Sequence, residues 1–219
     1  MRVLSTSASL SLAALLAASL AACADAIPPG TTPVAAPPSP GPTDALITFV
    51  RPVSVCDTGE WAVVVDDRGR FVGNVSTDTQ ISYATTPGDH VFYAWSNDDV
   101  DVDINPNFNP IAAVRLRAVA GQSHYVSVEV TSPCSVRSYF EMHAVSGHSA
   151  GWADLEEALG KTHPMSCDPA VGQSLLDAHP RHLQRRLRLG NRKLALLELT
   201  RGLSGEQEVL LDETAGTMQ

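Results

Sequence analysis

The sequence predicts a mainly β protein, an antiparallel β-sandwich of about seven or eight strands with a C-terminal α-helical appendage. Three observations lead to this fold class. Between Ala45 and Val145, short runs of β-branched and aromatic residues alternate with turn residues. The same stretch lacks the alternation of strands and helices that a parallel sheet needs. After Val145, apolar residues recur at the spacing of a helix instead.

The predicted strands follow one another closely. Residues 61–65 and 70–75 are separated by Asp-Asp-Arg-Gly, a sequence typical of a hairpin turn. Pro87 and Gly88 predict the turn before residues 90–95. The complete set of predicted strands is 45–50, 61–65, 70–75, 80–85, 90–95, 113–119, 125–130 and 136–145.

The predicted helices span residues 152–159, 168–178 and 180–199. Asp168 and Pro169 form a favourable N-cap and first-turn pair for the second helix. Pro180 must start or kink a helix, so the second and third helices are separate. The packing stripe of the third helix consists of Leu183, Leu187, Leu194 and Leu197.

The N-terminus carries the pattern of an exported protein. Arg2 gives a short basic region, an apolar run of Leu, Ala and Ser follows, and small residues precede Cys23. The run is shorter than the roughly 20 apolar residues that a membrane-spanning helix needs. Residues 1–22 are therefore predicted to be a signal peptide. An ordinary secretory signal peptide, cut after Ala22 or Ala24, is the alternative.

The sequence Leu-Ala-Ala-Cys that ends at Cys23 resembles the lipobox of bacterial lipoproteins. The resemblance implies that Cys23 becomes the mature N-terminus and carries several acyl chains. At about 0.8 kcal/mol per buried methylene, such chains form a stable membrane anchor. Ala24, directly after the cysteine, implies an outer-membrane lipoprotein that faces the periplasm, with inner-membrane retention or surface exposure as alternatives.

Composition divides the rest of the chain and limits its partners. The predicted segments are a signal peptide 1–22, a Pro-rich linker 23–43, a β-sandwich 44–145, a helical region 146–213 and a disordered tail 214–219. The linker is expected to hold the folded part off the membrane surface. With 24 acidic and 15 basic residues, the net charge of −9 disfavours nucleic acid as a partner.

Three stretches carry a family resemblance: VVVDDRGRFVGNV, YATTPGDH and VRLRAVAGQSHYVSVEV. Together they resemble the bacterial lipoprotein β-domain of the DUF2846 type, related to PEGA-like modules, over residues 45–130. The resemblance implies an envelope-associated domain and brings no catalytic residues. The chain departs from the family pattern in an acidic insert, residues 97–110, and in its cysteines.

The sequence GHSAG at residues 147–151 matches the G-x-S-x-G nucleophile motif and makes Ser149 a candidate catalytic residue. The remaining members of a triad would come from Asp168, Asp177, His179 and His182. A hydrolase of this class needs a largely parallel sheet before the serine, which this sequence does not predict. We therefore expect no enzyme activity and no cofactor, with a serine esterase as the alternative.

Alternate carboxylates in the acidic insert, Asp99, Asp101 and Asp103, are oxygen ligands of the type that Ca²⁺ prefers. An EF-hand loop is excluded because Ile104 and Pro110 occupy its glycine and closing glutamate positions. A solvated acidic loop is the prediction, and a calcium- or glycan-binding module is the alternative. The histidines are scattered without a metal-ligand spacing, which disfavours zinc.

The C-terminal region carries a basic run without an acid between Asp177 and Glu198. The run consists of Arg181, Arg185, Arg186, Arg188, Arg192 and Lys193. A solvated helix face, a partner surface, contact with anionic headgroups and pairing with the acidic β-domain would each account for it.

With Cys23 lipidated, the three remaining cysteines allow at most one disulfide within the chain. Cys56 and Cys134 each follow a predicted strand closely, so this pair is favoured over Cys134 with Cys167. The sequence thus predicts a lipid-anchored envelope protein that acts as a structural or protein-interaction module. We expect its partner to bind through the C-terminal helices.

Overall fold

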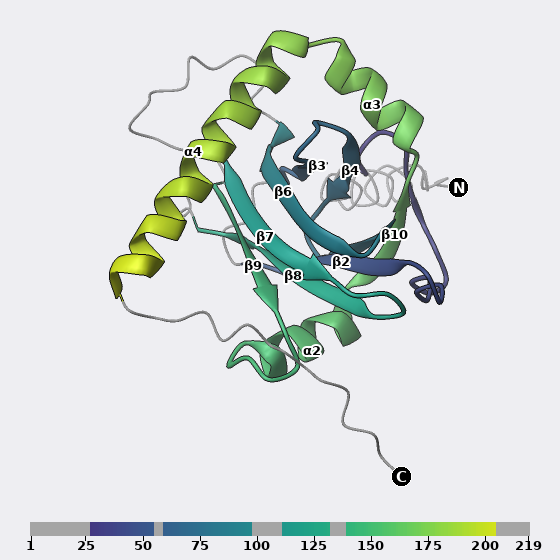
Figure 1. Cartoon of the computed structure of the whole chain (residues 1–219). Coiled ribbons are helices and arrows are strands. Elements are labelled where there is room, and N and C mark those ends of the chain that lie inside the picture. Colours follow the sequence, from purple (N-terminus) through teal and green to yellow (C-terminus); the bar gives the residue numbers. More distant parts are fainter. Residues whose placement is uncertain (1–26, 55–58, 98–110, 132–138, 205–219) are drawn as a thin grey trace, which may run out of the picture.

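The computed structural model describes residues 27–54, 59–97, 111–131 and 139–204. Ten strands lie in this part of the chain: β1 (Thr31–Pro33), β2 (Ala45–Arg51), β3 (Ala62–Asp66), β4 (Phe71–Val75), β5 (Thr79–Thr85), β6 (Gly88–Ser96), β7 (Ala112–Ala118), β8 (Ser123–Val130), β9 (Phe140–Val145) and β10 (His163–Cys167). The helices described are α2 (Trp152–Lys161), α3 (Pro169–Asp177) and α4 (Pro180–Ser204). The prediction of a mainly β protein with C-terminal helices is confirmed (Figure 1).

The strands form two sheets. The first has six strands in the order β1-β10-β5-β2-β8-β9, and the second has four in the order β4-β3-β6-β7. The expectation of purely antiparallel pairing is wrong at two places, because β2 pairs with β8 and β10 pairs with β5 in parallel. A parallel pair needs a long connection. The four-stranded sheet provides it between β2 and β8, since its strands intervene in the chain.

One hydrophobic core lies between the two sheets. Phe49 of β2 and Phe92 of β6 are both fully buried, and their rings meet edge to face with centroids 5.2 Å apart. Every strand from β2 to β10 contributes at least one side chain to this cluster. We refer to the two sheets with this cluster as the β core.

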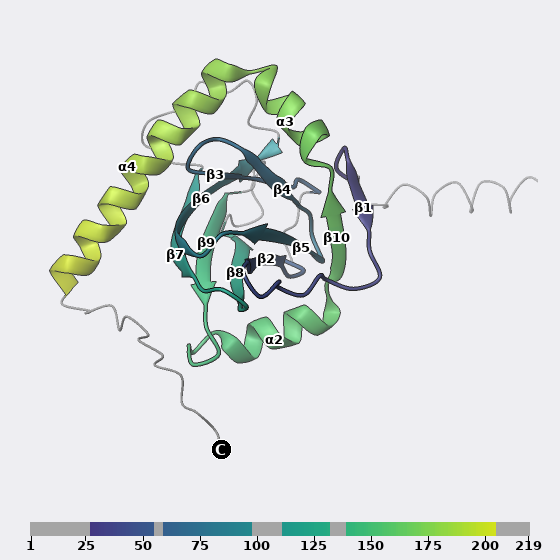
Figure 2. The ribbon, with the colours of Figure 1, turned by 45° about the vertical axis from the view of Figure 1, so that its right-hand side comes forward.

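Helices cover the outer faces of both sheets. On the six-stranded sheet, Leu155 and Ala158 of α2 pack against Val50. On the four-stranded sheet, α3 contacts β4 and α4 contacts β7. Figure 2 shows α2 below the β core and the α3–α4 pair around its other side. The helices therefore extend the hydrophobic packing beyond the two sheets.

The predicted linker 23–43 and the predicted helical region 146–213 each contain a strand that was not expected, and these two strands pair with each other. Thr31–Pro33, inside the Pro-rich tract, is a strand that pairs antiparallel with β10. Strand β10 was not predicted, because its sequence HPMSC is short and lacks an alternating pattern. The pairing uses backbone groups: Val34 donates its N–H to the Pro164 carbonyl at 3.0 Å. Backbone pairing of this kind leaves no trace in composition.

Several local predictions are confirmed. The Asp168 carboxylate caps α3 by accepting from the backbone N–H of Ala170 at 2.8 Å, and Pro169 occupies the first turn. Helix α4 begins at Pro180 and continues to Ser204, five residues beyond its predicted end. The last predicted strand, 136–145, is observed as Phe140–Val145, and residues 136–138 lie outside the described residues.

Candidate functional site

Helix α4 is held on the four-stranded sheet by close packing near its middle. At Gly190 a side chain is excluded, because a Cβ there would lie 2.3 Å from the Tyr93 ring. The Tyr93 hydroxyl donates to Oδ1 of Asn191 at 2.6 Å, and Leu194 is buried one turn later. Three leucines of the predicted stripe, Leu183, Leu187 and Leu194, thus lie on the packed side of α4. The fourth, Leu197, is exposed, so the predicted stripe is wrong at its C-terminal end.

Two members of the predicted basic run belong to this packed side. Arg186 is only 4% exposed, and its guanidinium lies over the Trp95 ring, 5.1 Å from the centroid. Lys193 is half-buried, and burial lowers its pKa while the nearby Glu141 carboxylate acts in the opposite direction. The sequence did not separate these residues from the rest, because their neighbours come from strands distant in the chain.

The other members of the run share the outward side of α4. These exposed residues are Arg181, Arg185, Arg188 and Arg192. Their spacing of four, three and four residues places them in one row along the helix. The row lies in the N-terminal half of α4, where the helix dipole disfavours positive charge, and the first turn has no acid. Helix stability therefore does not explain this basic row.

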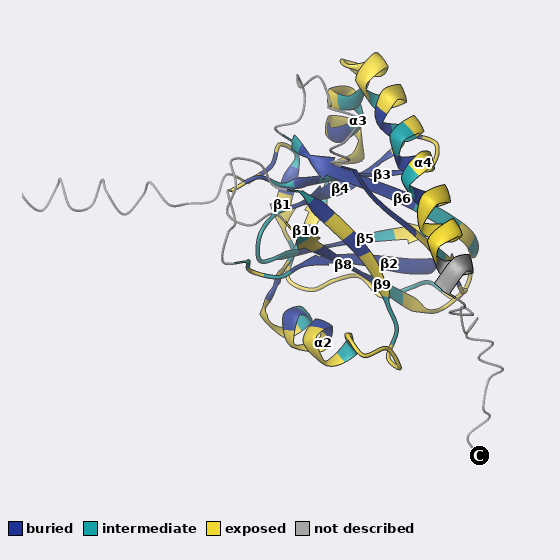
Figure 3. Cartoon of the chain, turned by 90° about the vertical axis from the view of Figure 1, so that its left-hand side faces the viewer, coloured by how far each residue is buried: buried dark blue, intermediate teal, exposed yellow. Residues whose placement is uncertain are grey.

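The outward side becomes apolar toward the C-terminal end of α4. No residue from Ala195 to Thr200 is buried, and Leu196 and Leu199 are 64% and 66% exposed (Figure 3). On the opposite side of the same segment, Glu198 pairs with Arg115 of β7 at 2.8 Å. We call the four arginines with Leu196 and Leu199 the outward face of α4. Such a face can bind a segment that offers carboxylates beside apolar side chains.

Ser149 lies in the turn between β9 and α2. Its hydroxyl is exposed and donates to the Ser146 carbonyl at 2.8 Å. His179 and His182 lie at the α3–α4 junction, on the side of the β core opposite α2 (Figures 1 and 2). The structure therefore does not bring the serine together with either histidine.

The acidic triad candidates lie with the histidines around α3. The Asp168 carboxylate is engaged as the N-cap, and Asp177 accepts from Nε2 of Gln173 at 2.9 Å. Both aspartates stabilise helix α3, and α3 and α2 lie on different sides of the β core (Figure 2).

The predicted calcium ligands Asp99, Asp101 and Asp103, and the cysteines Cys23, Cys56 and Cys134, lie outside the described residues. The connections that contain Cys56 and Cys134 start at the same end of the β core. Arg51, which precedes the first connection, is fully buried and lies over the Phe140 ring that follows the second, 4.9 Å from its centroid.

Cys167 occupies a different place. In the described part of the chain it is a free cysteine, and its Sγ accepts from the backbone N–H of Asn74 at 3.3 Å. Strand β10, which carries Cys167, is separated from β8 by β5 and β2 in the sheet.

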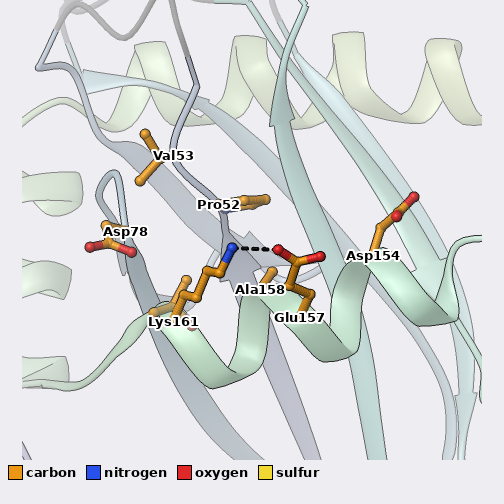
Figure 4. A pocket seen from close by; sticks show the side chains of 8 residues that line it. Pro52, Val53, Asp78, Asp154, Glu157, Ala158 and Lys161 are labelled. Atoms are coloured by element: carbon orange, nitrogen blue, oxygen red, sulfur yellow. Dashed lines mark hydrogen bonds and ion pairs between the residues drawn. The ribbon is translucent and has the colours of Figure 1, made fainter.

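A shallow, open hollow of about 200 Å³ lies beside α2 (Figure 4). It is lined by Pro52, Val53, Asp78, Asp154, Glu157, Ala158, Lys161 and Thr162. Lys161 pairs with Glu157 across the rim and lowers the pKa of that carboxyl. Within the four described ranges, no group of three or more His, Cys, Asp or Glu residues is placed to hold a metal ion.

No model of a known protein family matches the chain, and no curated protein matches its sequence. None of the helices described, α2 to α4, is long and apolar enough to cross a membrane.

Proposed function

We propose that this is a lipid-anchored cell-envelope protein whose β core presents the outward face of α4 to a partner protein. The observation that supports a binding role is the outward face itself, a row of four exposed arginines that continues into Leu196 and Leu199. Contiguous exposed apolar and charged groups of this kind are typical of interaction surfaces. For the β core we propose an immunoglobulin-like, PEGA-like sandwich of the DUF2846 type. The hydrophobic core that the two sheets share supports this proposal.

The position of β1 indicates how the anchored protein would be oriented relative to the membrane. Thr31, the first residue of β1, comes eight positions after Cys23, a stretch of chain that spans at most roughly 28 Å. A lipid at Cys23 would therefore hold the β1 edge near an outer membrane, in place of the long spacer that the whole tract 23–43 would make. Strand β1 and α4 lie on opposite sides of the β core (Figures 1 and 2). The outward face of α4 would then point away from the membrane, toward the periplasm.

The anchor is tested by metabolic labelling with an alkyne-modified fatty acid. We expect label on the wild-type chain and its loss, together with loss from the membrane fraction, in the Cys23→Ala variant. Unlabelled wild-type protein would contradict the proposed anchor.

The interaction surface is tested by photocrosslinking in cells. Photoreactive residues replace Gln184 and Leu175, which are exposed on α4 and α3, and Glu156 on α2 serves as the control. We expect the two test positions to capture the same envelope protein, and the control position to capture none of it. Single substitutions are preferable to deletion of both helices, which would expose Tyr93 and Trp95. Identical products from all three positions would contradict the proposed surface.

We also propose a disulfide between Cys56 and Cys134, which the contact between Arg51 and Phe140 supports. Peptide mapping without reduction would detect a linked peptide pair. A linked pair that contains Cys167 would contradict this connectivity.

A further inference from the structure

We propose that the outward face of α4 is covered by the C-terminal segment of the same chain, residues 206–213. This segment follows α4 directly and lies outside the described residues. Its sequence, EQEVLLDE, places three apolar residues between two pairs of acids. The inference goes beyond the proposed function, because it concerns a contact within one chain.

The charges of the two partners are complementary. The outward face carries four arginines, and α4 has no acid between Pro180 and Lys193. Residues 206–213 carry four acids and no base. Carboxylate and guanidinium groups form charge-assisted hydrogen bonds, which are stronger than neutral ones. Each exposed pair is weak, so the contact depends on several pairs and on the apolar residues together.

The order of side chains also agrees along the two segments. A chain that turns back after Ser204 passes Leu199 and Leu196 first and the arginines afterwards. Along residues 206–213, the apolar group 209–211 comes before the last two acids, Asp212 and Glu213. In an antiparallel return, apolar residues therefore meet the leucines, and these acids meet the arginines. Gly205 stands where helices commonly end in a turn.

The segment is long enough for this return. Along the helix axis, Leu199 lies about 8 Å from Ser204, Arg192 about 18 Å and Arg188 about 24 Å. Nine extended residues from Gly205 to Glu213 reach roughly 30 Å. The carboxylates of Asp212 and Glu213 can therefore reach both arginines.

A covalently attached segment has a further advantage over separate molecules. For short linkers, the effective concentration of the attached segment is in the millimolar range. A second copy of α4 is a poor occupant, because two identical outward faces offer no carboxylate to the arginines: a parallel arrangement brings arginines against arginines, and an antiparallel one brings them against leucines. Residues 206–213 would thus act as a built-in competitor, and a partner of the same acidic and apolar chemistry would have to displace them.

The test is intrachain photocrosslinking in the full chain, with p-benzoylphenylalanine in place of Leu196. We expect a crosslink from this position to residues 206–213, identified by peptide mass spectrometry. Arg188→Glu with Arg192→Glu should reduce its yield by about threefold or more, since exposed ion pairs are lost. Adding Asp212→Arg and Glu213→Arg to that variant should restore the yield, because the charges are exchanged.

Two controls distinguish this contact from nonspecific crosslinking. The same photoreactive residue at the exposed Val119, on the β7–β8 turn, should give no crosslink to residues 206–213. Lys161→Glu, a charge reversal on α2 at the other side of the β core, should leave the yield from Leu196 unchanged. The proposal is overturned by an absent crosslink, by a yield insensitive to charge reversal, or by crosslinks between chains in a mixture of light and heavy protein. The partner capture from Gln184 and Leu175 is a separate result, so either proposal can fail alone.

Discussion

Helices α2 and α4 each cover an outer face of the β core. They differ in the fraction of their length that packs against a sheet. Helix α2 has ten residues, and its buried side chains Leu155 and Ala158 lie on the six-stranded sheet. Helix α4 has 25 residues, and in its described stretch burial ends at Leu194. Covering the sheet accounts for the length of α2 but leaves the last part of α4 unexplained. This last part of α4 belongs to the surface for which we propose a binding role.

Helices α2 and α4 also differ in whether their charges are balanced within the helix. Helix α2 balances its charges locally, with Asp154 in its first turn, Lys161 in its last turn and the Glu157–Lys161 pair four residues apart. The basic row of α4 has no such balance within its own helix. The two helices thus differ in that α4 has no acid between Pro180 and Lys193 that could balance the basic row along the helix.

The largest effect is expected in the β core, which both helices cover. Phe92→Ala removes a fully buried ring that contacts Phe49 and should lower the free energy of unfolding by about 3–5 kcal/mol. Urea denaturation of the purified chain measures this loss. Val119→Ala, at an exposed position, should change it by no more than about 0.5 kcal/mol. A loss below that size for Phe92→Ala would show that the two sheets do not share this core.

A substitution at Gly190 should disrupt the packing of α4 on the four-stranded sheet. Gly190→Ala puts a Cβ against the Tyr93 ring and should destabilise the chain by about 1–3 kcal/mol. Hydrogen exchange should increase along α4 more than in the strands of the β core. Unchanged exchange would mean that α4 is not seated on Tyr93.

The same substitution in α2 should have the opposite sign. Gly160 is exposed, and a Cβ there meets nothing within 4 Å. Because alanine is the better helix former, Gly160→Ala should stabilise the chain by about 0.5–1 kcal/mol. Thermal denaturation of both variants under one condition gives the comparison directly. Destabilisation by Gly160→Ala would contradict the open space around position 160 of α2.

A modest pH effect on stability should come from His124 in the β core. Burial lowers the pKa of His124, and its Nε2 accepts from the backbone N–H of Val119 at 2.9 Å. The folded state therefore favours neutral His124, so the free energy of unfolding should fall as pH drops below the ordinary value of 6.5. Denaturation curves between pH 5 and 8 for wild type and His124→Gln should diverge in that direction. Parallel curves would contradict this assignment.

The smallest change in stability is expected at the exposed end of α4. Leu196→Ser with Leu199→Ser should alter the free energy of unfolding by no more than about 0.5 kcal/mol, because both side chains are exposed. Leu194→Ala, only two residues away but buried, should cost about 2–5 kcal/mol. Chemical denaturation separates the two variants. Equal losses would show that the last turns of α4 support the fold after all.

Predictions from the sequence succeeded where the determining pattern is local. The hairpin turn between β3 and β4, the cap at Asp168 and the start of α4 at Pro180 depend on a few neighbouring residues. The short strands β1 and β10 were missed because each exists through pairing with a segment distant in the chain. The basic run was found, but its division into packed and outward residues required the positions of Trp95 and Glu141.

The sequence by itself determined the mainly β class, the position of most strands and the helical character of the C-terminal region, because alternation, turns and caps act over a few residues. Tertiary structure alone decided the two parallel pairings, the attachment of Thr31–Pro33 to β10 and the direction in which each arginine of α4 points. These features depend on contacts between segments far apart in the chain. Such contacts form through backbone pairing and close packing, which neither composition nor local periodicity encodes.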